Sequence, residues 1–171
     1  MADFGATGGS KDVSSLDRLD RAILDVLAQD ARVSITELAS RIGLSKSPTQ
    51  ARLRRLEASG IIKGYRALLD PIALGLDHVA FVEVRLNDTR EPSLAAFNAA
   101  VRKVAEVEQA HMIAGNFDYL LKVRTRNMAA YRACLGDVIS NLPHVASTST
   151  FVAMQAVKEV VAPGADDPAA P

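Results

Sequence analysis

The stretch that decides the fold is SITELASRIGLSKSPTQARLRRL, residues 34–56. Its first half places apolar residues at helical spacing, so we expect a short helix that begins after a capping residue, Ser34. Glu37 follows three residues later and completes the pattern of a capping box. Gly43 predicts the end of this helix, because glycine adopts a left-handed conformation without steric cost.

A second helix is predicted for residues 46–58, after Ser45 as a second cap. Two short helices joined by a glycine turn form a helix-turn-helix, whose second helix enters the major groove of DNA. The side of this helix away from its leucines offers hydroxyl, amide, methyl and guanidinium groups, which can read base edges. The residues expected to contact DNA are Lys46, Ser47, Gln50, Ala51, Arg52, Arg54 and Arg55.

Within this set, Ser47, Gln50 and Arg54 are expected to read bases, and Arg52 and Arg55 are expected to contact phosphates. The alternative is a helical hairpin with a solvated charged face. Charge distribution favours DNA. The whole chain has 20 basic and 20 acidic residues and a formal net charge of zero, yet residues 41–66 contain seven basic residues and one acid. A local basic patch on a neutral protein indicates a surface for a polyanion, and double-stranded DNA is the predicted partner.

Residues 16–28 carry an apolar stripe and predict a first helix, so that a three-helix DNA-binding domain occupies residues 16–70. Its acidic residues are expected on the outer side, away from DNA; they are Asp17, Asp20 and Asp25. Residues 61–70 predict a short extended segment, a wing from which Lys63 and Arg66 could reach phosphates. The alternative for this segment is a linker with two solvated cations.

Residues 71–160 predict a second domain, in which strand patterns alternate with helix patterns. The expected elements are a strand at 78–86, a helix at 92–104, strands at 107–114 and 117–125, a helix at 128–142 and a strand at 144–157. This order is the ferredoxin-like βαββαβ arrangement, so the fold class is α+β with a winged helix-turn-helix in front. The sheet face left open by the helices is expected to be apolar and to drive dimerisation; the residues assigned to it are Val82, Val123, Phe151 and Val152.

Composition sets limits on the class of protein. A single cysteine, Cys134, excludes an internal disulfide and suits a reducing cytoplasm, and we expect it to be buried. No apolar run approaches the roughly 20 residues that span a bilayer, and no secretory signal is visible. Residues 1–15 and 161–171 are rich in small residues without periodicity and are predicted to be disordered.

Several stretches together resemble the Lrp/AsnC, or feast/famine, family of transcriptional regulators over residues 16–159. The matching stretches are LDRLDRAILDVLAQDAR, LASRIGLSKSPTQARLRRLEASGIIKGYRALLDP, GNFDYLLKVR, MAAYRACLGDVISNLPHV and STSTFVAMQAVKE. The resemblance implies DNA binding by the first domain and dimerisation by the second. It also implies further assembly into tetramers or octamers, and a small effector, usually an amino acid, that alters DNA binding or assembly.

The resemblance places this effector between C-terminal domains, near the hairpin turn at residues 115–119. A glycine turn can hold a carboxylate with backbone N–H groups, and a carboxylate nearby can pair with an α-ammonium. The expected effector-binding residues are Gly115, Asn116, Phe117, Asp118, Met128, Thr148 and Thr150. The alternatives are a plain turn, a methionine in the core and threonines that only favour a strand. The chain departs from the family at Asn116, where an acid is frequent.

Nothing in the sequence favours an enzyme. The three histidines are scattered without metal-ligand spacing, and there is no phosphate-binding loop, so no catalytic residue, metal or cofactor is expected. Two other functions stay open at this stage. One is a nucleoid-associated protein that binds DNA broadly with little effector control, and the other is an amino-acid-sensing module that binds protein.

Overall fold

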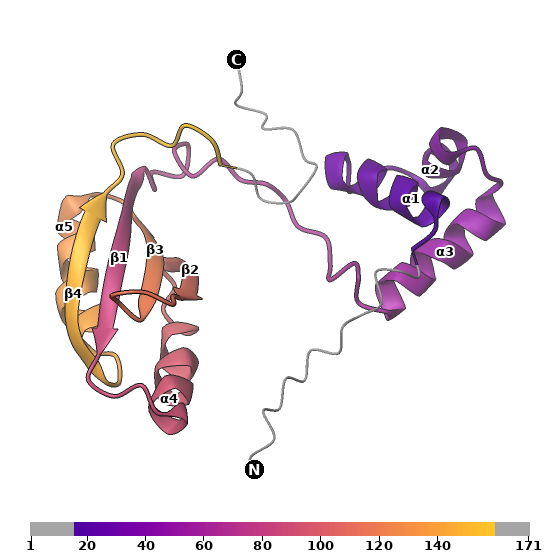
Figure 1. Cartoon of the computed structure of the whole chain (residues 1–171). Helices are drawn as coiled ribbons and strands as arrows, with labels where there is room; N and C mark the ends of the chain where they lie inside the picture. Colours follow the sequence, from indigo (N-terminus) through magenta and orange to yellow (C-terminus); the bar gives the residue numbers. More distant parts are fainter. Residues whose placement is uncertain (1–15, 160–171) are drawn as a thin grey trace, which may run out of the picture. The chain divides into compact units, whose positions relative to one another are not determined.

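The computed structural model describes residues 16–159 (Figure 1). The two segments predicted to be disordered, 1–15 and 161–171, lie outside this range. The chain forms two compact units, which contain residues 16–68 and 69–156. None of the helices in the described range is both long and apolar enough to cross a bilayer.

The N-terminal unit contains helices α1 (Arg18–Gln29), α2 (Ile35–Ile42) and α3 (Lys46–Ala58). The predicted three-helix arrangement is therefore confirmed, and α3 has the bounds expected from the sequence. Its core is a small apolar cluster around Ile23 of α1, Leu38 of α2 and Leu56 of α3, each at most 1% exposed. Each helix thus turns one stripe inward, as its periodicity predicts.

Residues close in sequence determine where α2 begins and ends. The Ser34 side chain accepts a hydrogen bond from the Glu37 backbone N–H at 3.2 Å. The Glu37 carboxylate instead accepts from Arg41 Nε at 3.0 Å, so the reciprocal half of the predicted capping box does not form. Gly43 ends α2 with φ 70°, the left-handed conformation that the sequence predicts at this position.

The segment after α3 is not a strand in this structure. Residues 61–70 form no ladder with any other described segment. Ile61 and Ile62 pack against the helical core, and the Tyr65 hydroxyl donates to the Glu57 carboxylate at 2.8 Å. The expected wing is therefore an irregular segment anchored to the end of α3.

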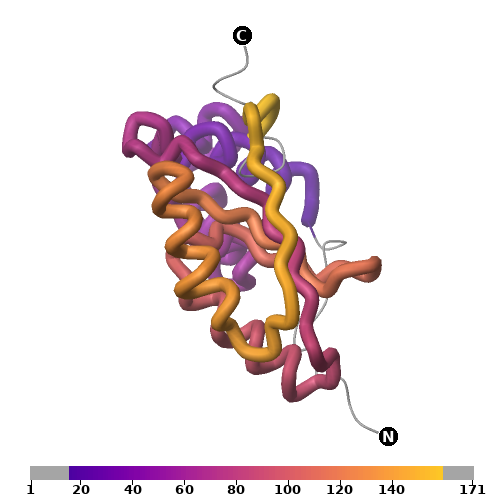
Figure 2. Tube along the Cα trace, turned by 90° about the vertical axis from the view of Figure 1, so that its left-hand side faces the viewer, coloured from indigo at the N-terminus to yellow at the C-terminus, as the bar shows by residue number. Residues whose placement is uncertain are grey.

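The C-terminal unit is a four-stranded antiparallel sheet with strand order β2-β3-β1-β4. Its strands are β1 (His78–Leu86), β2 (Val107–Met112), β3 (Tyr119–Thr125) and β4 (Val145–Val152), with helices α4 (Glu91–Val101) and α5 (Met128–Ala133). This is the predicted ferredoxin-like βαββαβ order. Figure 2, seen from the side on which β4 and α5 lie, shows α5 against one face of the sheet.

The second predicted helix of this unit is interrupted. After α5 the chain forms a π-helical turn (Cys134–Val138) and a 3₁₀ turn (Ile139–Asn141) instead of one helix to residue 142. The Asn141 amide donates to the carbonyls of Gly136 and Asp137 at 3.0 and 3.1 Å, which gives these backbone groups partners after the α-helical pattern is lost. Cys134 is buried, as predicted, and burial raises the pKa of its thiol.

The open face of the sheet differs from the prediction. Val82 and Val123 are fully buried on the face that the helices cover, and Val152 pairs with buried Ala80, which places it on that same side. Of the four expected residues, Phe151 alone lies on the open face, opposite Phe81 of β1. The expected set was wrong because alternation separates two faces without telling which of them the helices cover.

Candidate functional site

Helix α3 separates a buried side from an outward side. Thr49 is fully buried, and its hydroxyl donates to the Ser45 carbonyl at 2.9 Å, so this polar group is satisfied inside the unit. Ser45 makes no side-chain cap, contrary to the prediction. The residues left exposed on the outward side include Ser47, Gln50, Ala51 and Arg54. The structure therefore brings together on one surface the residues expected to read bases.

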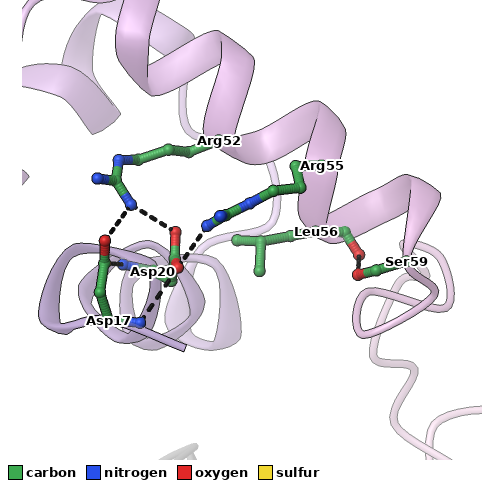
Figure 3. Close-up of polar contacts among 6 residues, drawn as sticks. All are labelled: Asp17, Asp20, Arg52, Arg55, Leu56 and Ser59. Atoms are coloured by element: carbon green, nitrogen blue, oxygen red, sulfur yellow. Dashed lines mark hydrogen bonds and ion pairs between the residues drawn. The ribbon is translucent and has the colours of Figure 1, made fainter. Parts of the chain in front are cut away.

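The two arginines expected to contact phosphates are held by α1 (Figure 3). Arg52 Nη1 donates to Asp17 Oδ2 at 2.6 Å and to Asp20 Oδ1 at 2.9 Å. Arg55 Nη2 donates to Asp20 Oδ2 at 2.5 Å. These bonds join residues 32 to 35 positions apart and fasten α3 to the first turn of α1.

Asp20 is fully buried, so its placement on the outer side of α1 was wrong. Asp17 and Asp20 also close a capping box: Asp20 N–H donates to Asp17 Oδ1 at 2.8 Å, and Asp17 N–H donates to Asp20 Oδ2 at 3.2 Å. The Asp20 N–H and the Arg52 guanidinium lower the pKa of the Asp17 carboxyl. The same ion pairs, first with Asp17 and then with Asp20, raise the pKa of Arg52.

The remaining cations of the basic stretch are available to a ligand. Arg41 is paired with Glu37. Within residues 16–159, four of the seven basic residues of the stretch 41–66 make no hydrogen bond or ion pair; they are Lys46, Arg54, Lys63 and Arg66. We call these four residues the free cations. Only Arg54 among them lies within the body of α3, beside Gln50 and Ala51.

The hairpin expected to hold the effector is longer than predicted, because β2 ends at Met112 and β3 begins at Tyr119. Asp118 closes this connection. Its backbone carbonyl accepts from Ile113 N–H at 2.9 Å and its N–H donates to the Val84 carbonyl at 3.0 Å. Its Oδ2 accepts from the Leu86 N–H at 2.7 Å, so one carboxylate oxygen already has a structural partner.

The turn itself does not have the backbone conformation of an anion-binding nest. Gly115 does not adopt a positive φ, whereas a nest needs neighbouring right- and left-handed residues. Gly115 and Asn116 are exposed, and Phe117 is half-buried. The structure therefore brings Gly115, Asn116, Phe117 and Asp118 together in one loop without a preformed carboxylate site.

The other expected effector residues lie elsewhere in the unit. Met128 begins α5 beyond the far end of β3, and at roughly 3.3 Å per residue that strand separates it from the hairpin by about 20 Å. Thr148 and Thr150 lie on β4, opposite Val84 and Val82. The Thr150 hydroxyl bonds to the Tyr131 hydroxyl at 2.5 Å. One chain thus does not gather the seven expected residues into one site.

A cavity of about 320 Å³ lies between α4 and β2. Its lining consists of Asn98, Val101 and Arg102 from α4 and the start of β2 from Val107 to Ala110. None of the expected effector residues lines it. Among residues 16–159, no three His, Cys, Asp or Glu side chains are placed to hold a metal ion.

The residues missed at the sequence level are Asp17 and Asp20 as partners of α3. A signal for them exists in principle, because the two acids and the two arginines, Arg52 and Arg55, share a three-residue spacing. Each pair therefore lies on one side of its helix. The spacing shows that the pairs could match, but not that α1 and α3 bring them together.

Comparison with known proteins gives two family matches. Residues 16–63 match the model of a winged helix-turn-helix DNA-binding domain, and residues 79–163 match the Lrp/AsnC ligand binding domain. Among solved structures, a Neisseria meningitidis transcriptional regulator in complex with L-methionine has a TM-score of 0.80 at 32% identity, over 86% of this chain and 95% of that one. Escherichia coli AsnC has a TM-score of 0.78 at 28% identity, over 86% of this chain and 97% of that one.

Similar proteins include a transcriptional activator and a leucine-responsive regulator. The proline dehydrogenase transcriptional activator of Rhodobacter capsulatus is 57% identical over 86% of this chain and 96% of its own length. The leucine-responsive regulatory protein of Escherichia coli K12 is 46% identical over 84% of this chain and 88% of its own length. The chain therefore belongs to the Lrp/AsnC family of transcriptional regulators and joins a helix-turn-helix DNA-binding domain to a ligand-binding domain of ferredoxin-like fold.

Proposed function

We propose that this regulator reads its DNA sites with the outward side of α3, where Arg54, Gln50 and Ser47 contact base edges. The observation that carries the assignment is the division of the arginines of α3: Arg52 and Arg55 are bound to acids of α1, whereas Arg54 is exposed and has no partner among the described residues. A guanidinium without an intramolecular partner can donate two bonds to one guanine.

The free cations Lys46, Lys63 and Arg66 are the proposed phosphate contacts. They lie at the start of α3 and in the segment that follows it, so they flank the base-reading residues along the chain. In this proposal Arg52 and Arg55 position the helix and are not primary phosphate contacts.

We further propose that a free amino acid is the effector and that it binds near the 113–118 connection at a contact between copies of the chain. The second carboxylate oxygen of Asp118 has no partner among residues 16–159 and can accept a hydrogen bond from an α-ammonium. Completion by a second copy is required because Met128 lies beyond the far end of β3 from this loop and Thr150 lies two strands away from β3, on β4.

The regulated gene in this proposal encodes an enzyme that consumes an amino acid, and proline dehydrogenase is the first candidate. The support is the 57% identity to the Rhodobacter capsulatus activator, against 46% to the leucine-responsive regulatory protein. Proline is therefore the first effector to test, followed by methionine, which is bound in the Neisseria meningitidis relative. The protein acts where its DNA is, in the cytoplasm, and we propose no catalytic activity for it.

Fluorescence anisotropy tests this function. The duplexes are the region upstream of the gene for this protein, the region upstream of a proline dehydrogenase gene, and a scrambled sequence, each with and without single L-amino acids. Preference for a native duplex that one amino acid changes would support the proposal. Equal affinity for all duplexes would favour a nucleoid-associated protein, and no affinity at moderate salt would favour a protein-binding module.

A matched pair of variants tests the base-reading residue. Arg54→Gln should weaken binding to the preferred duplex by roughly 5- to 150-fold, which corresponds to the 1–3 kcal/mol of a base-reading guanidinium, while scrambled DNA loses much less. Arg21→Gln removes the same charge from the exposed surface of α1 and serves as the control. Equal losses on both duplexes would exclude Arg54 from base recognition.

A further inference from the structure

The contact between α1 and α3 is electrically balanced. Two carboxylates, Asp17 and Asp20, face two guanidinium groups, Arg52 and Arg55 (Figure 3). The Asp20 carboxylate accepts three hydrogen bonds, from Arg52, from Arg55 and from the Asp17 backbone N–H. A buried carboxylate with several charge-assisted bonds is held firmly, because loss of all its cationic partners would leave its charge uncompensated.

The two arginines remain near the surface while they make these bonds. The Asp20 side chain is fully buried, but 27% of the Arg52 side chain and 58% of the Arg55 side chain are exposed. Both guanidinium groups are thus accessible to a DNA backbone that follows α3, yet their charge is already matched inside the protein. A phosphate would have to compete with Asp20 for the same donors.

This competition bears on how strongly the protein binds arbitrary DNA. Non-specific affinity comes from cations that neutralise phosphates and release counterions, and it carries no sequence information. Base contacts, in contrast, depend on the orientation of the recognition helix. A group that withholds two arginines from phosphates and fixes α3 at the same time therefore lowers non-specific binding and preserves specific binding.

We propose that Asp20 is a positioning residue that sets the ratio of specific to non-specific DNA affinity, by holding Arg52 and Arg55 against α1 and away from the DNA backbone. This inference rests on the proposed role of α3 as the DNA-reading helix. It assigns to a buried acid of α1, which contacts no DNA, a direct effect on discrimination between sequences.

The first test compares Asp20→Asn with Asp25→Asn in the full-length chain. Asp25 is an exposed acid of the same helix and makes no hydrogen bond or ion pair with α3, so both variants change the net charge of α1 equally. Asp20→Asn should strengthen binding to scrambled DNA and steepen the salt dependence by about 0.9 in log K against log salt for each released arginine. The specific to non-specific ratio should fall about threefold or more, and Asp25→Asn should leave it unchanged.

The second test is Arg55→Gln, which keeps the Asp20–Arg52 pair and therefore the attachment of α1 to α3. If Asp20 already withholds Arg55 from phosphates, this variant keeps the wild-type salt slope on scrambled DNA. A slope that falls by about 0.9 would show direct phosphate contact and overturn the inference. This test decides alone if Asp20→Asn does not fold, as judged by circular dichroism.

The proposed base reading by α3 and the positioning role of Asp20 can be refuted separately. A wild-type protein that does not distinguish native from scrambled DNA refutes the proposed base reading, whereas the salt slopes of the variants still test whether Asp20 withholds the arginines. A wild-type protein that discriminates, combined with an Asp20→Asn variant that behaves like Asp25→Asn, refutes the positioning role.

Discussion

Asp118 has two assignments that a pair of substitutions can separate. In the structure its Oδ2 accepts from the Leu86 N–H at 2.7 Å, at the end of β1, and Leu86 is only 9% exposed. In the proposed function its other oxygen pairs with the α-ammonium of the effector. Asp118→Ala removes both roles, whereas Asp118→Asn keeps a carbonyl oxygen that can accept from Leu86 and removes the negative charge.

The magnitudes follow from these contacts. Asp118→Ala leaves a buried N–H without a partner, which costs about 2 kcal/mol of unfolding free energy. In a unit of this size that loss lowers the midpoint of thermal unfolding by roughly 8–16 °C. Asp118→Asn replaces a charge-assisted bond by a neutral one and should lose about 1 kcal/mol or less. The loss of an ammonium–carboxylate contact should weaken amino-acid binding by about 10-fold or more.

Calorimetry supplies both measurements on the full-length protein: scanning calorimetry for stability and isothermal titration with the amino acid that binds the wild type most tightly. The expected pattern is an unstable Asp118→Ala variant and a stable Asp118→Asn variant that has lost affinity. Wild-type stability of Asp118→Ala would refute the structural cap. Wild-type affinity of Asp118→Asn would refute the ammonium contact, whatever its stability.

Three further predictions concern the fold, its pH dependence and its assembly. Gly43→Ala should lower the free energy of unfolding by about 1–2 kcal/mol, because alanine is strained at the φ of +70° that Gly43 adopts. An added Cβ would meet no atom within 4 Å, so this backbone strain is the only expected cost. An unchanged midpoint of thermal unfolding would contradict the prediction. The Arg90 guanidinium and the Ser93 hydroxyl hold the pKa of Asp88 well below its ordinary value of 3.8, so the stabilising contribution of the Asp88 carboxylate is present above about pH 4 and is lost as the pH falls. The difference in melting temperature between wild type and Asp88→Asn should therefore shrink from pH 5 to pH 2. A constant difference would contradict the lowered pKa. Phe151→Glu places a charge opposite Phe81 on the open face and should shift sedimentation toward smaller species, while Met154→Gln, which changes a fully exposed residue after β4, should not.

The elements with strong local signals were predicted well. The bounds of α3 and β1 are those expected from the sequence, because each is defined by a few neighbouring residues. They are Gly43 and its flanking helix stripes in one case, and in the other a Val-rich run from His78 to Leu86 whose second half alternates apolar and charged residues. Both patterns lie within a short stretch of sequence, so the bounds they predict do not depend on the rest of the fold.

Other features depended on contacts that periodicity does not encode. The helix expected at 128–142 contains a π-helical turn at Cys134–Val138, although its apolar spacing reads as continuous. The strand expected to reach residue 157 ends at Val152: one further hydrogen bond, from Ala153 N–H to the Val79 carbonyl at 2.9 Å, follows it, and Met154 is fully exposed. In both cases the regular structure is shorter than the sequence pattern predicts.

The candidate sites show the same limit. The outward side of α3 could be predicted from helical geometry, since burial of Thr49 and Leu56 leaves Gln50 and Arg54 outside. The partners of Arg52 could not, because Asp17 and Asp20 precede it by more than 30 residues. The effector residues were grouped by a resemblance that includes more than one copy of the chain, and one copy separates them across the sheet.

The ion pairs of Arg52 and Arg55 also reduce the number of cations that this protein can offer to DNA phosphates. Counted along the chain, residues 41–66 carry seven basic residues, but the structure leaves four free cations. Arg54 is assigned to bases, so three of them, Lys46, Lys63 and Arg66, are the proposed phosphate contacts, and they correspond to a salt slope of about −2.7 for one chain. Two chains on one DNA would double it to about −5.4. At a measured stoichiometry of two chains per duplex, a slope near −5.4 would therefore agree with the proposal, whereas a slope near −13 would mean that all seven basic residues contact phosphates and that Asp20 withholds none of them.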